Sequence, residues 1–176
     1  MSLVLRHKPG EIGLQMDANG WVSVEELVEK FNAKGIDVNL ETICTIVVTN
    51  DKKRFAFNSN QTKIRASQGH SIEVELDLPA VTPPDILYHG TAQHFVAGIL
   101  ANGLQKKNRR HVHLSITVET AIAVGSRHGK PAILKIDAKA MYTAGYCFYL
   151  SENKVWLTDA VPAEYIVTYT DSEERL

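Results

Sequence analysis

Three arginines of this 176-residue chain stand among small or apolar neighbours, where a guanidinium reaches water only at the edge of a cleft. They are Arg6 in VLRHKP, Arg65 in KIRASQGHS and Arg127 in VGSRHGKP. Arginine presents a planar fork of hydrogen-bond donors that matches a phosphate group. If the three side chains converge, they can hold a phosphomonoester dianion; otherwise each caps a helix or pairs with a nearby carboxylate.

Two histidines form a second candidate set. His89 in LYHGT and His113 in VHLS each stand at the end of an expected strand, next to Gly90 and Thr91 or to Ser115. Such positions can gather imidazole, hydroxyl and backbone groups around a sugar. Either histidine can also be a half-buried strand residue with a single hydrogen bond. The residues themselves leave both interpretations open.

Composition limits the kinds of partner. The formal net charge of −1 argues against a protein that coats nucleic acid through bulk charge, so any nucleic-acid partner must be bound locally. The basic cluster KKNRRH, residues 106–111, is either a solvated turn or a contact for an RNA backbone. No apolar run approaches membrane-spanning length. The isolated Cys44 and Cys147 suit a reducing compartment, and we expect a cytoplasmic protein.

Several common catalytic motifs are missing from the sequence. It has no Gly-x-Gly-x-x-Gly between a strand and a helix, and no phosphate loop ending in Gly-Lys-Ser/Thr. No serine stands in a nucleophile elbow. The histidines do not fall at metal-ligand spacing and the cysteines form no zinc pattern, so we expect no metal site.

The elements expected in residues 1–78 resemble those of a winged helix. A helix over LVLR must end before Pro9, which places Arg6 and His7 at its carboxyl end. Two amphipathic helices follow, with Ser23 and Asn39 as their N-caps. RFAFN and KIRAS then predict a β-hairpin, and SIEVEL predicts a third strand that extends it.

Residues 79–85, PAVTPPD, form a stiff proline-rich linker and the predicted domain boundary. Beyond the linker, residues 86–176 carry many short strands and few helices. The expected strands are ILYHG, HVHLS, AILKID, CFYLS, KVWLT and EYIVTYT, and the expected helices are HFVAGILANG and TVETAIAVGSRHG. This pattern predicts an α+β lobe built on a mixed or antiparallel sheet.

Six segments, taken in order, resemble the NAD-dependent RNA 2′-phosphotransferase family: LVLRHKPG, IRASQGHS, LYHGT, VHLS, VGSRHGKP and VWLT. The resemblance implies an amino-terminal winged-helix lobe and a carboxy-terminal ADP-ribosyltransferase-like lobe. It also assigns the family's residue roles to positions of this chain. The catalytic set would be Arg6, His7, Arg65 and Arg127, and the NAD-binding set His89, Gly90, Thr91, His113, Ser115 and Val155.

One departure from the family pattern concerns the amino terminus. Only five residues precede Arg6, fewer than the pattern has, so either the terminus is trimmed or the first helix is shortened. A second feature concerns Val155, where many protein-modifying ADP-ribosyltransferases have a glutamate. A phosphate nucleophile needs no such base, because it is already charged.

The resemblance implies a two-step reaction on an RNA with an internal, tRNA-like 2′-phosphate. The phosphate attacks C1″ of NAD and nicotinamide leaves, which gives a 2′-phospho-ADP-ribosylated RNA. The ribose O2″ then attacks the phosphorus, and RNA with a 2′-hydroxyl and ADP-ribose 1″,2″-cyclic phosphate are released. NAD is the co-substrate, no metal is required, and the enzyme is expected to be a monomer without a membrane partner.

Two alternatives stay open at this point. The chain could be an ADP-ribosyltransferase that modifies protein or nucleic-acid ends, or a non-enzymatic winged-helix regulator that senses NAD or ADP-ribose. Residues 1–80 carry nine Lys and Arg against eleven Asp and Glu, which disfavours DNA binding by the first lobe.

Overall fold

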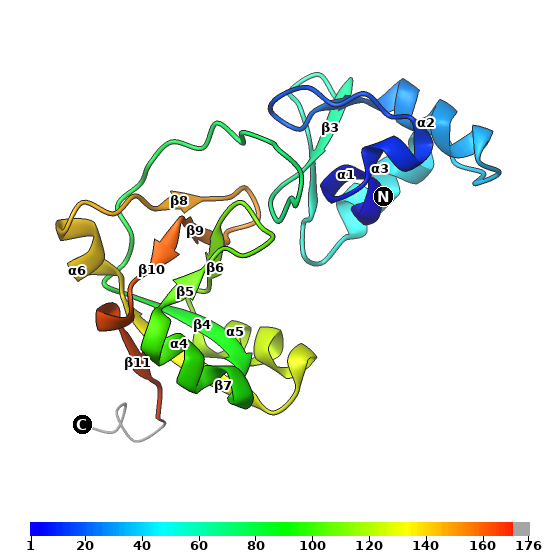
Figure 1. Cartoon of the computed structure of the whole chain (residues 1–176). Helices are drawn as coiled ribbons and strands as arrows, with labels where there is room; N and C mark the ends of the chain where they lie inside the picture. The colour runs from blue at the N-terminus through cyan, green and yellow to red at the C-terminus, as the bar shows by residue number, and fades with distance from the viewer. Residues whose placement is uncertain (171–176) are drawn as a thin grey trace. The chain divides into compact units, whose positions relative to one another are not determined.

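The computed structural model describes residues 1–170 of the chain, which divide into two compact units. The first unit comprises Met1–Leu78 together with two short pieces from later in the chain, Asn108–Arg110 and Ser151–Asn153. The second unit holds the other described residues (Figure 1). Each unit is described by itself below.

The first unit contains three α-helices and one 3₁₀-helix. They are α1 (Ser2–Arg6), η1 (Pro9–Ile12), α2 (Val24–Ala33) and α3 (Leu40–Thr49). The predicted N-caps are confirmed. The Ser23 hydroxyl accepts a hydrogen bond from the Glu26 N–H at 3.3 Å, and the Asn39 side chain accepts one from the Thr42 N–H at 2.8 Å. Each cap therefore provides an acceptor for a first-turn N–H group, which has no hydrogen-bond partner within the helix.

A three-stranded antiparallel sheet completes the first unit, in the order β1 (Val22–Ser23), β3 (Lys63–Ala66), β2 (Phe55–Phe57). The hairpin of β2 and β3 was expected, but the prediction of a strand over SIEVEL is wrong. Val74 and Leu76 are buried, which produces the alternation, but the backbone of this segment forms no ladder with a strand. The Ser71 N–H donates to the carbonyl of Arg6 at the end of α1, and the Glu75 N–H donates to the Ala18 carbonyl. Buried and exposed residues thus alternate in this segment although it does not belong to a β-sheet.

The core of the first unit anchors its short first helix. With five residues, α1 is too short to be stable alone. Val4 and Leu5 are buried in the core, so packing holds α1 and fixes where it ends. The other buried core residues are Leu14, Val22, Val24, Leu27, Phe31, Ile43, Phe55, Ile64 and Ala66.

The second unit is built from short strands in three small antiparallel sheets, ordered β11-β7-β4, β6-β9-β8 and β10-β5. The expected α+β class is confirmed at this level. Its strands are β4 (Ile86–Ala92), β5 (Leu104–Gln105), β6 (Val112–Leu114), β7 (Pro131–Asp137), β8 (Tyr149–Leu150), β9 (Trp156–Thr158), β10 (Ala160–Val161) and β11 (Ile166–Thr168). Its helices are η2 (Gln93–Phe95), α4 (Val96–Asn102), α5 (Val118–Gly125), η3 (Ser126–His128), α6 (Ala138–Thr143) and η4 (Ala163–Tyr165).

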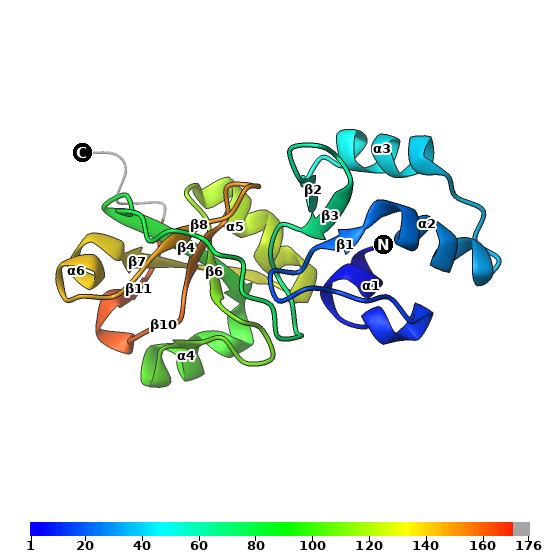
Figure 2. The same cartoon turned by 90° about the horizontal axis from the view of Figure 1, so that it is seen from above.

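Strand β4 is central to the second unit. It pairs with β7 along its whole length (Figure 2). Tyr88 also exchanges backbone hydrogen bonds of 2.8 and 2.7 Å with Ser115, which follows β6. Helix α5 packs closely on β4 at Gly90, where a Cβ would lie 1.8 Å from the Ala121 carbonyl oxygen. The glycine therefore allows the helix to approach the strand that carries His89.

The proline-rich segment 79–85 has partners within the second unit. The Val81 N–H donates to the Phe148 carbonyl at 2.8 Å, and Ala80 forms a β-bridge with Tyr149. No helix within residues 1–170 combines the length and the apolarity needed to cross a membrane.

Candidate active site

The carboxyl end of α1 is bonded to a loop formed by residues 67–71, SQGHS, here called the SQGHS loop. His7 is the C-cap of α1, and its Nδ1 lies 2.9 Å from the Ser71 Oγ. The Ser71 N–H donates to the Arg6 carbonyl at 3.0 Å. These two contacts hold the Arg6-His7 pair, predicted from the sequence, against a loop that is some sixty positions away along the chain.

The Arg6 guanidinium lies directly on the SQGHS loop. A Cβ at Gly69 would be 1.7 Å from Nη2 of Arg6, so only glycine leaves room for this side chain. Gly69 also has a φ of +80°, a backbone conformation that favours glycine. The Nε of Arg6 is buried without a hydrogen-bond partner, and no carboxylate among residues 1–170 pairs with its guanidinium.

Arg65 projects from β3 and is nearly enclosed, with 9% of the residue exposed. Its Cζ lies 4.3 Å from the ring centroid of Trp21, a cation–π contact. Its Nη2 donates to Oε1 of Glu152 at 2.8 Å, while Nε is buried without a partner. The guanidinium is therefore held over the indole ring, with part of its donor edge unsatisfied.

Glu152 belongs to the short piece Ser151–Asn153 of the first unit. Asn153 anchors this piece, because its Nδ2 donates to the Lys52 carbonyl at 3.1 Å. The Ser151 hydroxyl donates to Oδ1 of the same asparagine at 2.7 Å. Glu152 was not predicted from the sequence; its nearest signal was the polar SEN triplet, residues 151–153, which lies one residue before the family-like VWLT segment.

His70, also missed from the sequence, is the buried residue of the SQGHS loop. It is 2% exposed, and its Nε2 has no hydrogen-bond partner. Burial, followed by the neighbouring charges of Arg6, His7, Arg65 and Arg110, lowers the pKa of His70 from 6.5 to about 4. At neutral pH the ring is therefore uncharged and buried.

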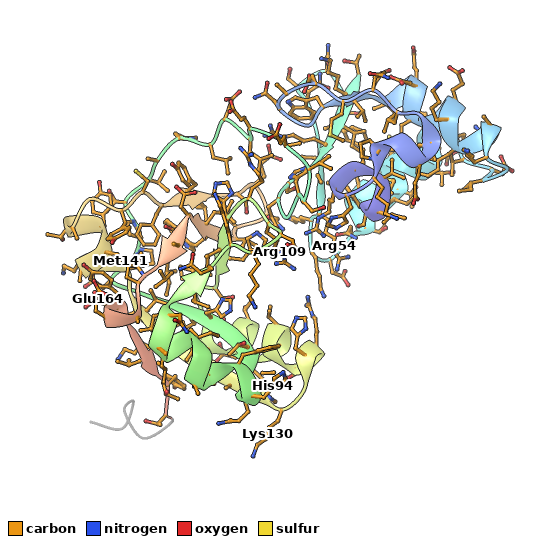
Figure 3. All side chains as sticks on the ribbon, in the orientation of Figure 1. Arg54, His94, Arg109, Lys130, Met141 and Glu164 are labelled. Atoms are coloured by element: carbon orange, nitrogen blue, oxygen red, sulfur yellow. The ribbon has the colours of Figure 1, made fainter. Side chains whose placement is uncertain are left out.

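The surroundings of Arg6 and His7 are strongly electropositive. Burial, followed by the charges of Arg109 and Arg54, lowers the pKa of Arg6. Burial, followed by Arg6 and Arg109, lowers the pKa of His7. No carboxylate of the described chain counters either effect. Figure 3 labels Arg54 and Arg109, which belong to the same unit. This arrangement favours an anionic ligand.

The second unit gathers the histidines predicted to bind NAD. The Nδ1 of His89, on β4, lies 3.0 Å from the His113 carbonyl oxygen of β6. Thr91 is buried on β4. Strands β6 and β9 are antiparallel, and Leu114, the last residue of β6, pairs with Trp156, the first residue of β9. Ser115 and Val155 therefore lie at the same end of this strand pair. His89, His113 and Ser115 thus come from two neighbouring strands.

Arg127 lies on η3 of the second unit and is exposed. The first unit brings together Arg6, His7 and Arg65, whereas convergence with Arg127 stays a prediction. Among the residues described, no cluster of three histidine, cysteine or acidic side chains is suited to hold a metal ion.

Comparison with known proteins decides the family. Residues 1–160 match the model of "RNA 2′-phosphotransferase, Tpt1 / KptA family". The chain belongs to this family. A relative from Hahella chejuensis, named "Probable RNA 2′-phosphotransferase", is 58% identical over 94% of this chain and 89% of its own length. Relatives with the same name from Flavobacterium johnsoniae and Acaryochloris marina are 56% and 53% identical, over 91% and 92% of their lengths.

Membership in the RNA 2′-phosphotransferase family confirms the resemblance inferred from the six sequence segments and the expected transferase class. It favours neither the modification of protein or nucleic-acid ends nor a non-enzymatic regulator. The family match spans both the arginine-rich site of the first unit and the histidine pair of the second.

Proposed function

We propose that this chain removes an internal 2′-phosphate from RNA by transferring it to NAD, with release of nicotinamide and ADP-ribose 1″,2″-cyclic phosphate. The observation that carries the proposal is the Arg6 guanidinium, held against Gly69 among other cations and without a carboxylate partner in the described chain. An RNA 2′-phosphate dianion supplies the missing negative charge. Family membership supports the same substrate.

The first role of the arginines is to orient the nucleophile. A phosphate dianion needs no deprotonation, so Arg6 and Arg65 have only to aim one of its oxygens at the electrophile. Trp21 and Glu152 hold the Arg65 guanidinium in place before the substrate arrives. In the second step, negative charge grows on the phosphoryl oxygens, and preset guanidinium donors stabilise it without reorganising. We assign Arg127 to the same phosphate on the basis of the family pattern.

His7 is the proposed proton-transfer residue. Burial and neighbouring cations lower its pKa, so the ring is neutral at physiological pH and can accept a proton from O2″. Its hydrogen bond to Ser71 orients the ring. The bond from phosphorus to the RNA 2′-oxygen breaks in this step, and the departing oxygen takes up a proton. Protonated His7 can supply that proton.

The residues of the second unit suit a dinucleotide. NAD supplies the electrophilic C1″ carbon and the ribose that receives the phosphate. The imidazole of His89, fixed by the His113 carbonyl, and the hydroxyl of Ser115 are hydrogen-bonding groups of the kind that ribose hydroxyls require. With Thr91 and Val155 they would hold the ADP-ribose half. Gly90 contributes through the packing of α5.

The finer description of the fold is part of the same proposal. Two capped helices and a three-stranded antiparallel sheet support a winged-helix lobe, and the small antiparallel sheets of the second unit support an ADP-ribosyltransferase-like lobe. We place the enzyme in the cytoplasm, where its free Cys44 and Cys147 stay reduced, as a monomer whose proposed residues come from one chain.

The test mixes the protein, NAD and a short RNA with one internal 2′-phosphate and analyses the products by mass. We expect free nicotinamide, RNA lighter by one phosphate, and the cyclic phosphate. The variants His7→Ala and Arg65→Ala should slow the second step and let ADP-ribosylated RNA accumulate. A stable ADP-ribosyl product from the wild type would instead identify an ADP-ribosyltransferase, and an absence of nicotinamide release would contradict enzyme function altogether.

A further inference from the structure

We propose that Ser71 is a positioning residue for the proton transfer of the second step: its hydroxyl accepts a hydrogen bond from the Nδ1–H of His7 and leaves Nε2 as the nitrogen that exchanges the proton. The inference rests on the proposed function, since it deepens the role assigned there to His7. It adds which nitrogen of the ring reacts and which residue selects it.

The backbone holds Ser71 beside His7. The Ser71 N–H donates to the carbonyl of Arg6, the residue before His7, at 3.0 Å. The His7 N–H in turn donates to the Leu3 carbonyl at 3.0 Å, which ties the histidine to the last turn of α1. Neither bond uses the Ser71 side chain. The hydroxyl can therefore be replaced while the SQGHS loop stays attached to the helix.

The Ser71 side chain adds a third contact, which distinguishes the two nitrogens of the His7 ring. Its Oγ lies 2.9 Å from Nδ1. Both residues are exposed, so this bond competes with rotation of the ring into water. A hydroxyl can accept or donate, and the bond is therefore compatible with either neutral tautomer.

The direction of the bond decides whether His7 can act as a base at Nε2. When Nδ1 carries the hydrogen, Ser71 accepts it and Nε2 has a lone pair that can take the proton of O2″. When Nε2 carries the hydrogen, that nitrogen cannot accept another. In the first tautomer the Nδ1–H also keeps its acceptor after the ring is protonated. The hydroxyl then does not have to turn as His7 gains and loses the proton.

His89 of the second unit has a related arrangement at Nδ1. This nitrogen lies 3.0 Å from the carbonyl oxygen of His113, a group that can only accept. The neutral His89 ring therefore carries its hydrogen on Nδ1. Both histidines thus have an uncharged oxygen at Nδ1, and the tautomer that is fixed at His89 is the one that we assign to His7.

The charges around His7 explain why an uncharged partner suits it. Burial, followed by the charges of Arg6 and Arg109, lowers the pKa of His7 and keeps the ring neutral at physiological pH. Lys8, the next residue, is paired at 3.0 Å with Glu11 of η1.

A carboxylate in place of the Ser71 hydroxyl would work against the site. It would raise the pKa of His7, because a neighbouring negative charge favours the protonated ring. It would also attract Arg6, which the phosphate needs. His70, on the other side of the peptide bond, is neutral at neutral pH and adds no charge. The hydroxyl thus orients the ring without changing the charge of the site.

The first experiment reads the tautomer of His7 in the free protein at pH 8, by long-range proton–nitrogen correlation NMR. The variant His7→Gln identifies the signals of His7. We expect hydrogen on Nδ1 in the wild type and in Ser71→Thr, which keeps the hydroxyl. Ser71→Ala should shift the ring towards the Nε2–H form, which free imidazole side chains prefer in water. A wild-type ring with its hydrogen on Nε2 would overturn the proposal.

The second experiment separates the two chemical steps in a single turnover, with saturating NAD and an RNA that has one internal 2′-phosphate. Nicotinamide release reports the first step, and formation of the cyclic phosphate reports the second. Ser71→Ala should slow the second step about tenfold, the effect of losing one hydrogen bond to a charged ring, and the first by less than about twofold. Ser71→Thr should recover most of the rate. Ser59→Ala, at an exposed serine between β2 and β3, is the matched control and should change neither step.

The pH profile of the second step distinguishes positioning from a merely structural role. In the wild type the rate should rise as His7 loses its proton, with a midpoint below the ordinary 6.5. Ser71→Asp should move this midpoint upward by about one pH unit, because the carboxylate raises the pKa of His7. Ser59→Asp adds the same charge elsewhere in the unit and should leave the midpoint in place. An unmoved midpoint in Ser71→Asp would contradict the proposal.

The outcomes separate this inference from the proposed function. If Ser71→Ala slows both steps equally, or neither, the role of Ser71 is wrong and the proposed function remains. If the wild type releases no nicotinamide, the proposed function itself fails. The tautomer of the free protein is measured without substrate and still decides which hydrogen bond Ser71 makes.

Discussion

Arg65 and Glu152 are 87 positions apart in the chain, yet their side chains meet at 2.8 Å in the first unit. Glu152 is partly exposed, with 42% of its side chain accessible, while Arg65 is nearly enclosed. The carboxylate thus occupies part of the donor edge that a phosphate would use. Its contact keeps Arg65 in place, but a dianion must displace or share it.

We therefore expect Glu152→Gln to strengthen phosphate binding. Glutamine keeps an oxygen that accepts the hydrogen bond from Arg65 but removes the competing negative charge. A partly exposed charge pair contributes about 1 kcal/mol at most, so the dissociation constant of inorganic phosphate should fall by about fivefold at most. Titration calorimetry can measure it. Weaker binding by this variant would show instead that the full charge of Glu152 is needed to position Arg65.

Gly69→Ala should disrupt the site without unfolding the protein. The new Cβ would occupy the place of the Arg6 Nη2, which lies 1.7 Å away, and the long side chain would have to move. Displacing a positioning group by about 1 Å can cost on the order of a hundredfold in rate, and we expect a loss of that size in kcat/KM.

Gly35→Ala is the matched control for Gly69→Ala. Gly35 has a similar φ of +76°, and nothing lies within 4 Å of its Cβ position. Both variants carry the same backbone strain, but only the change at Gly69 meets Arg6. Comparable activity losses in the two variants would contradict the proposed role of the SQGHS loop.

His70 should make the protein acid-sensitive. Its folded-state pKa of about 4 is below the ordinary value of 6.5, so the unfolded chain binds the proton first as the pH falls. The stabilisation is fully present above pH 6.5, declines below it, and levels off near pH 4. At pH 5 the loss from this residue should be about 2 kcal/mol.

Urea unfolding of the wild type and His70→Gln, at pH 7 and pH 5, tests this effect. The variant should lose less free energy of unfolding between the two pH values than the wild type does. His94→Gln provides the control, because His94 is exposed. If both variants follow the wild-type pH dependence, then His70 is not the group responsible.

Phosphate transfer should continue in excess EDTA. The guanidinium groups around Arg6 and Arg65 supply the positive charge that stabilises the phosphoryl oxygens in the proposed mechanism. We expect the initial rate to change by less than about twofold, a difference well under 1 kcal/mol in activation free energy. A rate that vanishes with EDTA and returns with added Mg²⁺ would require a metal in the mechanism.

Local features of the sequence predicted many elements correctly. The caps at Ser23 and Asn39 act over three residues, so the helices they begin follow from nearby side chains. The hairpin of β2 and β3 was equally local. The strand expected over SIEVEL failed because alternation reports only which side chains are buried, and a loop segment bonded to Arg6 and Ala18 can show the same pattern.

Some residues of the candidate site could be predicted from the sequence, and others could not. Arg6, His7 and Arg65 could be named from their unusual neighbours and from the resemblance to the RNA 2′-phosphotransferases, which the comparisons confirmed at the level of the family. Glu152 and His70 could not. His70 lies within the family-like segment IRASQGHS, but its burial, like the contact of Glu152 with Arg65, comes from packing between segments far apart in the chain.

The sequence by itself determined the family, the chemistry of the side chains and the local beginnings and ends of the helices, because these depend on residue type and short-range order. Only the tertiary structure decided that Gly69 supports Arg6, that Glu152 meets Arg65, and that residues 108–110 join the first unit. Burial and charge proximity are properties of the packed chain, so the pKa of a histidine such as His70 is set by folding and not by its neighbours in sequence.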